Sequence, residues 1–251
     1  MTEVARQFSA AASRYDQHSD IQQRVFAQLL EKAPESASHI VDIGSGTGAM
    51  TALLGKRYPS ATIVGVDVAP KMVMFAQQHY GNARTHFVCS GMERFQLETP
   101  ADLLFSNATF QWVPHPKEAL IHAAAQLAPN AHVALSSFGP ETYRELAMVI
   151  RQVWGHPVIT SASGFLDGEA LKQCLDAVFG EVTIVQYRYQ RHFESLSALL
   201  SSIKHTGTRG IPEGPKHWTP GLFREVERAY VAHYRRIMAT YQVFYCTARC
   251  G

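Results

Sequence analysis

The residues with the clearest chemical potential form the segment Asp42-Ile43-Gly44-Ser45-Gly46-Thr47-Gly48. Its three glycines can adopt positive φ and let a ligand lie against bare backbone. A β-rich run, His39–Ile43, precedes the segment, and a helical stretch, Ala49–Tyr58, follows it. At such a turn the N–H groups that begin the helix face the anionic end of a ligand. The segment therefore predicts a ligand site rather than an ordinary tight turn.

Two acids accompany these glycines. Asp67 ends the β-rich run Thr62–Asp67, nineteen residues after Gly48, where a carboxylate can accept hydrogen bonds from both ribose hydroxyls of an adenosine. The glycines also satisfy the dinucleotide pattern G-x-G-x-x-G/A, so a nicotinamide- or flavin-dependent oxidoreductase is an alternative. Asp42 stands two residues before the first glycine, where its charge opposes a pyrophosphate but suits an ammonium group. This acid favours a ligand with a methionine tail.

The elements that must position these residues alternate along the chain. Strands alternating with helices predict an α/β fold, with a Rossmann-like, seven-stranded and mostly parallel sheet covered on both faces. Beyond the elements named above, β-rich runs are expected at Thr85–Cys89, Asp102–Ser106, His132–Phe138, Val182–Tyr189 and Thr240–Thr247, and helices at Lys71–Tyr80, Lys117–Leu127, Glu141–Val153 and Asp167–Phe179.

The length of 251 residues fits one domain with an elaborated edge. Apolar residues at helical spacing predict N-terminal helices over residues 1–36, and a ligand-binding core follows over 37–140. A long excursion between two late strands is usually functional. We therefore expect lid insertions at 141–164 and 191–239 over the carboxyl edge of the sheet, with the remaining core at 165–190 and 240–251.

Composition excludes several classes of protein. Hydrophobic residues make up 46% of the chain and charged residues 18%, yet no apolar run approaches the roughly 18 residues of a membrane span. The N-terminus lacks the basic start and apolar run of a secretory signal. The four cysteines lack metal-ligand spacing, which predicts no metal site and a reducing, cytoplasmic location: Cys89, Cys174, Cys246 and Cys250.

From about residue 38 to 138 the chain resembles the class I S-adenosylmethionine-dependent methyltransferases. Asp67-Val68-Ala69-Pro70-Lys71-Met72 is similar to their segment in which the acid holds ribose and apolar neighbours pack on adenine. Gly91 stands where these enzymes usually carry an acid for the adenine amino group, so Glu93 or backbone groups are the expected substitutes. The resemblance implies S-adenosylmethionine as cofactor, bound by Tyr15, Asp42, Gly44, Ser45, Gly46, Gly48, Asp67, Val68, Met72, Gly91, Met92, Glu93, Asn107 and Ala108.

The segment Phe105–Val113 is similar to a smaller group within this superfamily whose acceptors are carboxylates. Two members compete, the biotin-pathway malonyl-acyl-carrier-protein O-methyltransferases (the BioC family) and the trans-aconitate methyltransferases. The N-terminal stretch Phe8–His18 and the later stretches Ser202–Gly210 and Met238–Phe244 resemble the first. In the second of these stretches Thr208 stands where the BioC pattern has alanine.

The resemblance implies methylation of the free carboxylate of malonyl-acyl-carrier protein or malonyl-CoA. A carboxylate is already a nucleophile, so catalysis needs alignment rather than a general base, and we expect Tyr15, Gln111 and Trp112 to position the reactants. Asp16 and His18 are expected to point to different faces of a helix and are interpreted as a solvated pair. The acceptor carboxylate is assigned to one or more basic residues, Lys204, Arg209, Arg235 and Arg236.

The charge is uneven along the chain. Residues 188–251 carry ten Lys and Arg against four Asp and Glu, a net charge of +6, whereas residues 1–187 carry −4. A solvated basic face is one interpretation, and a docking face for an acidic carrier protein is the other. The docking candidates are Lys216, Arg224, Arg228, Arg235 and Arg236. A nucleic-acid partner is not expected, because Asn107–Trp112 lacks the Asn/Asp-Pro-Pro-aromatic signature.

Overall fold

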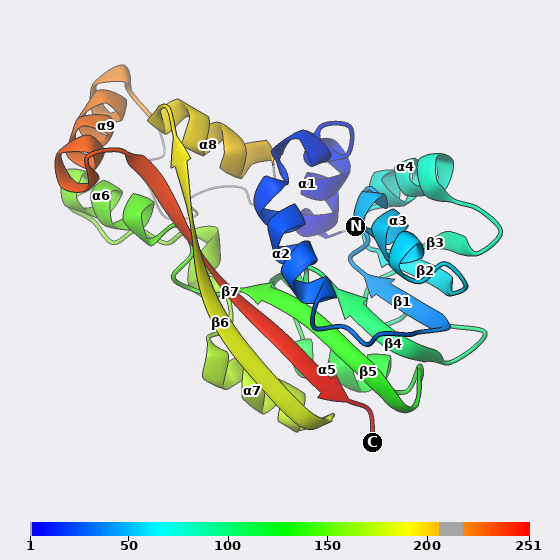
Figure 1. Ribbon diagram of the computed structural model, residues 1–251. Coiled ribbons are helices and arrows are strands. Elements are labelled where there is room, and N and C mark those ends of the chain that lie inside the picture. The colour runs from blue at the N-terminus through cyan, green and yellow to red at the C-terminus, as the bar shows by residue number, and fades with distance from the viewer. Residues whose placement is uncertain (1, 206–217) are drawn as a thin grey trace.

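A seven-stranded sheet forms the centre of the computed structural model, which describes residues 2–205 and 218–251 (Figure 1). The strand order is β3-β2-β1-β4-β5-β7-β6. Neighbours from β3 to β5 pair in parallel, whereas β7 runs antiparallel to both β5 and β6. The predicted, mostly parallel sheet is therefore confirmed. The strands are β1 His39–Ile43, β2 Thr62–Asp67, β3 Thr85–Cys89, β4 Ala101–Ser106, β5 Leu127–Phe138, β6 Gly180–Phe193 and β7 Ile237–Arg249.

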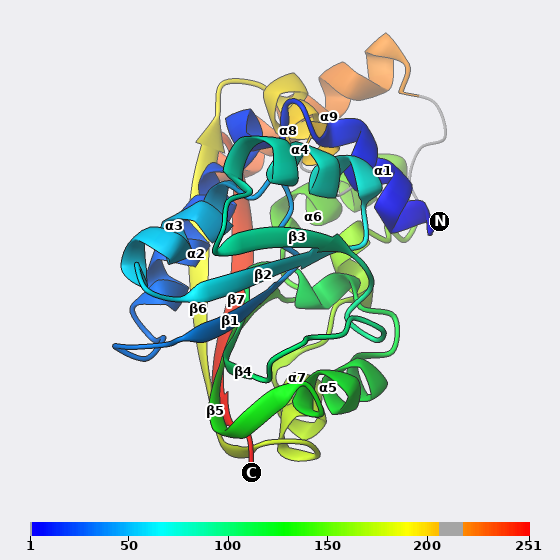
Figure 2. The ribbon, with the colours of Figure 1, turned by 90° about the vertical axis from the view of Figure 1, so that its right-hand side faces the viewer.

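Helices cover both faces of this sheet (Figure 2). Successive residues of a strand point to opposite faces, so Ile40 and Val41 of β1 belong to two separate apolar cores. The core around Ile40 includes α2 (Asp20–Leu30) and α3 (Ala49–Arg57). The core around Val41 includes α5 (Pro116–Ala124) and α7 (Gly168–Asp176), while α4 (Pro70–Tyr80) packs on β2 and β3.

Helix boundaries follow the local chemistry and correct two predictions. Proline occupies the first helical position of α4 and α5, where its missing N–H costs nothing. Asp167 caps α7 by accepting a hydrogen bond from the Ala170 N–H at 2.9 Å, so the helix begins after it rather than at it. Leu127 was expected to end a helix, but it begins β5 and pairs with Ala101 of β4.

The late strands β6 and β7 are longer than their sequence pattern predicts. They stay paired to Phe193 and Ile237, well beyond the point where β5 ends, and form the long arm seen in Figure 1. The expected lid boundaries at 191 and 239 are therefore wrong, because both positions lie within this ladder. The helices around the end of the arm are α6 (Arg144–Trp154), α8 (Leu196–His205) and α9 (Pro220–Tyr234), and the short helix η3 (Ser161–Gly164) lies between α6 and α7.

The N-terminal segment lies over the carboxyl edge of the sheet. It consists of α1 (Glu3–Ala11) and the short helix η1 (Tyr15–His18), which lead into α2. Ala12 packs with Ala69 and Met72, next to Phe8 and Tyr15. The N-terminal segment is thereby held against the start of α4. In the described parts of the chain, no helix is long and apolar enough to cross a membrane.

Candidate active site

The glycine loop follows β1 and leads into α3 at the carboxyl edge of the parallel strands. Gly44, Gly46 and Gly48 have φ of +75°, +55° and +82°, a region that residues with a Cβ rarely adopt. A Cβ at Gly44 would lie 2.0 Å from Thr109 Oγ1, and a Cβ at Gly48 would lie 2.9 Å from the Phe87 ring. Packing therefore requires glycine at both positions. Gly44 and Gly46 line a cavity, whereas Gly48 lies outside it and shapes the loop.

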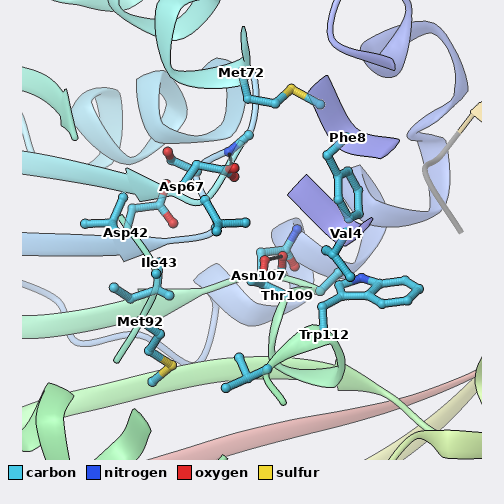
Figure 3. Close-up of a pocket in the computed structure, with 18 of the residues that line it drawn as sticks. Val4, Phe8, Asp42, Ile43, Asp67, Met72, Met92, Asn107, Thr109 and Trp112 are labelled. Atoms are coloured by element: carbon cyan, nitrogen blue, oxygen red, sulfur yellow. Dashed lines mark hydrogen bonds between the residues drawn. The ribbon is translucent and has the colours of Figure 1, made fainter. Parts of the chain in front are cut away.

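This cavity gathers the ends of β1, β2, β3 and β4 under the N-terminal segment (Figure 3). All the residues predicted to bind the cofactor line it except Gly48. The sequence interpretation had missed several other lining residues, which come from α1, η1, the glycine loop, α3 and the loop after β4. They include Val4, Phe8, Asp16, Thr47, Met50, Thr109, Val113 and Pro114.

Asp67 stands at the end of β2 and faces the cavity (Figure 3). Its Oδ2 accepts a hydrogen bond from the Gly46 N–H at 2.9 Å, and its Oδ1 accepts one from the Ala69 N–H at 2.8 Å. Burial raises the pKa of Asp67 above its usual value, and the two hydrogen bonds oppose that rise. The carboxylate is thereby fixed in orientation, and its remaining lone pairs can accept hydrogen bonds from paired hydroxyls of a ligand.

Asp42 is the more deeply buried acid, with 4% of its surface exposed. The pKa of Asp42 is raised to about 7, because burial and the charge of Asp67 raise it by more than the hydrogen bond from Thr51 lowers it. Thr51 Oγ1 donates that hydrogen bond to Oδ2 over 2.6 Å. A buried carboxylate with a raised pKa is stabilised by a cation. This site accordingly suits a ligand with an ammonium group.

The end of β3 brings Gly91, Met92 and Glu93 to the cavity. A Cβ at Gly91 would lie 2.4 Å from both carboxylate oxygens of Glu93. The Glu93 carboxylate therefore occupies the space where the side chain of an acid at position 91 would begin. Its Oε1 also contacts Arg94 Nε at 3.1 Å. Gly91 lacks the acid that is usual at this position, and the carboxylate of Glu93, two residues later, lies in its place.

In the segment after β4, some residues line the cavity and others form hydrogen bonds that hold its wall in place. Asn107 lines the cavity, and its Nδ2 donates to the carbonyl of Gln22 in α2 at 3.0 Å. Gln111 had been expected to wall the cavity, but its amide is hydrogen-bonded to the Ala108 carbonyl at 2.7 Å and to the Phe138 N–H at 3.2 Å. Gln111 does not line the cavity, because its hydrogen-bonding groups join the loop after β4 to the end of β5.

Aromatic rings close one side of the cavity. Trp112 of η2 (Phe110–Trp112) stands edge-on to Phe8 of α1, with ring centroids 5.9 Å apart, and Phe8 lies 6.1 Å from Tyr15. Trp112 also packs edge-on against Phe165 at 5.1 Å. Burial, followed by the charges of Asp67 and Asp16, raises the pKa of Tyr15, which keeps its hydroxyl protonated. The rings make this wall apolar.

Asp16 and His18 point in different directions, as expected, but the interpretation of the two as solvated is wrong. Asp16 lines the cavity, and its Oδ1 accepts a hydrogen bond from Thr47 Oγ1 of the glycine loop at 2.8 Å. His18 instead stacks on His205 of α8, with centroids 4.5 Å apart. The two residues separate because η1 bridges two partners, the glycine loop and α8.

The basic residues predicted to hold an acceptor carboxylate do not reach the cavity in this structure. Lys204, Arg235 and Arg236 are exposed and do not line it, and Arg209 lies outside the described residues. Lys216, predicted for docking, also lies outside them, whereas Arg224 and Arg228 are exposed on α9. No group of three or more metal-ligating side chains occurs in residues 2–205 and 218–251.

Comparison with known proteins agrees with this architecture. Residues 41–135 match the family model described as a methyltransferase domain. The chain is 30% identical to the malonyl-[acyl-carrier protein] O-methyltransferase of Bacillus cereus over 97% of this chain and 95% of the relative. It is also 30% identical to the enzyme of the same name from Anoxybacillus flavithermus, over 96% and 95%. The chain belongs to this family of S-adenosylmethionine-dependent methyltransferases.

Solved structures share the fold at much lower identity. The YcgJ protein from Bacillus subtilis superposes with a TM-score of 0.63 at 13% identity, covering 90% of this chain and 98% of that one. The N-methyltransferase NodS from Bradyrhizobium japonicum, in complex with S-adenosyl-L-homocysteine, gives a TM-score of 0.56 at 14% identity and covers 99% of both chains. These likenesses establish the class I methyltransferase fold.

The residues around the cavity fit the cofactor of this family. Ser45 Oγ is buried at the glycine loop and has no hydrogen-bond partner among the described residues. No cationic side chain is recorded beside Asp42 in the described part of the chain, and Asp67 presents an oriented carboxylate in the same cavity. S-Adenosylmethionine carries hydroxyls, an ammonium group and a carboxylate that match this set. The oxidoreductase alternative is therefore set aside.

Proposed function

We propose that this enzyme transfers a methyl group from S-adenosylmethionine to the free carboxylate of malonyl-acyl-carrier protein. Support comes from relatives of that name that match nearly the whole chain, including the regions outside the common methyltransferase domain. The shared length covers the N-terminal segment and the β6–β7 arm. These are the parts that distinguish acceptors within a common cofactor-binding fold.

The observation that carries the choice of a carboxylate is the state of the acids in the cavity. Asp16 accepts a hydrogen bond from Thr47, Asp42 from Thr51 and Asp67 from two backbone N–H groups, and Glu93 is paired with Arg94. No histidine, lysine or cysteine lines the cavity in the described part of the chain. An amine or alcohol acceptor must lose a proton to a base, whereas a carboxylate carries none to lose. The cavity therefore favours an acceptor that is already ionised.

The roles of the lining residues follow from their positions. We assign Asp42 to the ammonium end of the cofactor, Asp67 to the ribose hydroxyls and Glu93 to the adenine amino group. When bound, the cofactor supplies an electrophilic methyl group, whose transfer breaks a C–S bond, forms a C–O bond and cancels the sulfonium charge against that of the carboxylate. Tyr15 and Trp112 exclude water and restrict the orientation of the acceptor.

The product would be the methyl ester of a malonyl thioester. Esterification masks a charge, so enzymes of fatty-acid synthesis with apolar pockets can elongate the chain, and we assign this step to the start of the pimeloyl part of biotin synthesis. A cytoplasmic location is part of the same proposal. It is in keeping with four cysteines that all lack disulfide partners.

Mass spectrometry after incubation with S-adenosylmethionine tests the acceptor. Malonyl-acyl-carrier protein, malonyl-CoA and trans-aconitate are offered separately and then together at equal concentration. Gain of one methyl by the malonyl thioesters, fastest on the carrier protein, is the expected result. Methylation of trans-aconitate alone, or of none of the three, would overturn the proposal.

A further inference from the structure

Gln22 of α2 is a further residue of the cavity lining that sequence reasoning had not selected as a site residue. It exposes only 6% of its surface. Its backbone carbonyl accepts the hydrogen bond from Asn107, but its side-chain amide has no hydrogen-bond partner among the described residues. A buried amide without a partner costs free energy, so this group is expected to find its partner in a ligand.

The amide of Gln22 is accessible from the cavity. In the described part of the chain, the side-chain polar atoms that are both sealed from solvent and unpaired are Ser9 Oγ and Ser45 Oγ. The amide atoms of Gln22 differ from these, because they are unpaired but keep some exposed surface. Since Gln22 lines the cavity and is otherwise buried, that surface faces the cavity. A ligand in the cavity can therefore bind the amide.

The amide of Asn107, which also lines the cavity (Figure 3), is already engaged at both ends. Its Nδ2 donates to the Gln22 carbonyl at 3.0 Å, and its Oδ1 accepts a hydrogen bond from Ser136 Oγ at 3.0 Å. These bonds hold α2 against the loop after β4. Of the side-chain amides that line the cavity in the described residues, Gln22 therefore keeps its donors and its acceptor for a ligand.

Gln22 lies close to the first turn of α3, which also contacts Asp42. Met50 of that turn lines the cavity, and its Sδ lies 3.1 Å from Asn107 Nδ2, the atom that donates to the Gln22 carbonyl. Thr51, the next residue of α3, donates its hydroxyl to Asp42 at 2.6 Å. The first turn of α3 and one amide therefore connect Gln22 to the acid that we assign to the ammonium group.

The N-terminus of α3 favours an anion at this position. The first N–H groups of a helix have no partner within it, and the helix dipole is positive at that end. Gly48 precedes α3 and has no side chain to cap it, and the first turn of α3 carries no acid. Asp16 contacts the preceding loop through the hydroxyl of Thr47. The Gln22 amide and the start of α3 together provide donors for a carboxylate.

We propose that Gln22 and the N-terminus of α3 bind the carboxylate at the amino-acid end of the cofactor. The inference rests on the proposed assignment of Asp42 to the ammonium group, which is attached to the same carbon atom as that carboxylate. A neutral amide suits this position, because a lysine or arginine there would pair with Asp42 in the ligand-free protein. The site thereby discriminates against adenosine thioethers that lack the carboxylate.

The test compares S-adenosylhomocysteine with its decarboxylated analogue, S-adenosylthiopropylamine, which keeps the ammonium group. Isothermal titration calorimetry with the full-length protein measures both Kd values. Gln22→Leu should raise the Kd of S-adenosylhomocysteine about ten- to hundredfold, the range for a lost hydrogen bond to a charged group. The Kd of the decarboxylated analogue should change less than about threefold, because that ligand lacks the group that Gln22 binds.

Gln22→Glu tests the sign of the bound charge. The new carboxylate should repel that of S-adenosylhomocysteine and attract the ammonium group of the analogue. The Kd of S-adenosylhomocysteine should therefore rise at least as far as in Gln22→Leu, whereas the Kd of the analogue should fall several-fold. If Gln22 bound the ammonium group instead, Gln22→Glu would bind both ligands more tightly, and that result would overturn the inference.

A matched control and a melting curve separate binding from folding. Gln28→Leu makes the same change on the same helix but outside the cavity, where Gln28 bonds to Glu31 at 3.1 Å. It should leave both Kd values unchanged. Gln22→Leu should not lower the melting temperature of the ligand-free protein, because it removes a buried amide that has no partner there.

The outcomes distinguish this inference from the proposed function. Equal weakening of both ligands by Gln22→Leu, with a lower melting temperature, would show that the amide supports the cavity wall and would overturn the inference. An unchanged Kd of S-adenosylhomocysteine with a raised KM of the acceptor would overturn it as well. The proposed function fails separately, when the wild-type enzyme methylates no malonyl thioester, whatever the two Kd values are.

Discussion

Asp42 offers the sharpest test of how the cavity recognises its cofactor. Burial raises the pKa of this carboxyl from 3.8 to about 7 in the ligand-free protein. An ammonium group beside it stabilises the ionised form, so the ligand binds the deprotonated state. Affinity is therefore expected to rise as the pH rises through about 7 and then to level off. This direction is the reverse of what a histidine contact to an anion would give.

The size of the effect follows from proton linkage. With a pKa of about 7, about one molecule in eleven carries ionised Asp42 at pH 6, and about ten in eleven do so at pH 8. The Kd of S-adenosylhomocysteine should thus fall about tenfold between pH 6 and pH 8. Isothermal titration calorimetry in buffers of matched ionic strength measures this change.

The Asp42→Asn variant isolates the group responsible. It should bind S-adenosylhomocysteine more weakly at pH 8 and lose most of the pH dependence. His18→Asn is the control, because His18 is a titratable residue of the adjacent η1, and it should keep the tenfold change. A flat wild-type profile, or an Asp42→Asn variant with the wild-type slope, would refute the role of Asp42.

The raised pKa also means that ionised Asp42 lowers the stability of the ligand-free protein. Because its folded pKa exceeds the unfolded value of 3.8, the acid favours the folded state when protonated. That contribution is lost as the pH rises from about 4 through about 7, and its upper bound is about 4 kcal/mol. Asp42→Asn should therefore raise the melting temperature of the ligand-free protein at pH 8. A lower melting temperature would contradict this account.

Three other substitutions or conditions probe the site. Gly44→Ala should destabilise the ligand-free protein by more than Gly46→Ala, because a Cβ at Gly44 meets Thr109 while one at Gly46 meets nothing within 4 Å. Gly46→Ala costs about 1–2 kcal/mol for its positive φ alone. Chemical denaturation measures both losses of stability, and equal losses would refute the packing argument. Glu93→Ala should weaken S-adenosylhomocysteine about tenfold but leave unchanged the binding of the inosine analogue, which lacks the adenine amino group; equal weakening of both would exclude that contact. Raising NaCl from 50 to 300 mM (about a 2.5-fold shorter Debye length) should reduce kcat/KM for malonyl-acyl-carrier protein several-fold more than for the small malonyl thioester, and parallel curves would remove the basic docking face.

Much of the cofactor half of the molecule could be predicted from local sequence. The strands His39–Ile43, Thr62–Asp67 and Thr85–Cys89 occur with the predicted bounds, because buried parallel strands are short apolar runs between glycine and proline turns. The glycine loop and Asp67 were also predictable, since backbone conformation and the end of a strand are local properties. Their position in one cavity follows from the parallel order of the strands.

The acceptor half depended on contacts that lie far apart in the sequence. Gln111 and Trp112 are neighbours in the chain, yet only Trp112 faces the cavity, because the Gln111 amide is hydrogen-bonded to backbone groups of the loop after β4 and of the end of β5. Arg191 of β6 is one of ten Lys and Arg in residues 188–251, and its own segment does not distinguish it from the others. The extension of β6 and β7 beyond the sheet brings it to Asp20, which is 171 positions earlier in the chain. Such long-range packing decides which charged side chains are buried and which groups they contact. The sequence pattern of a single segment cannot predict these contacts.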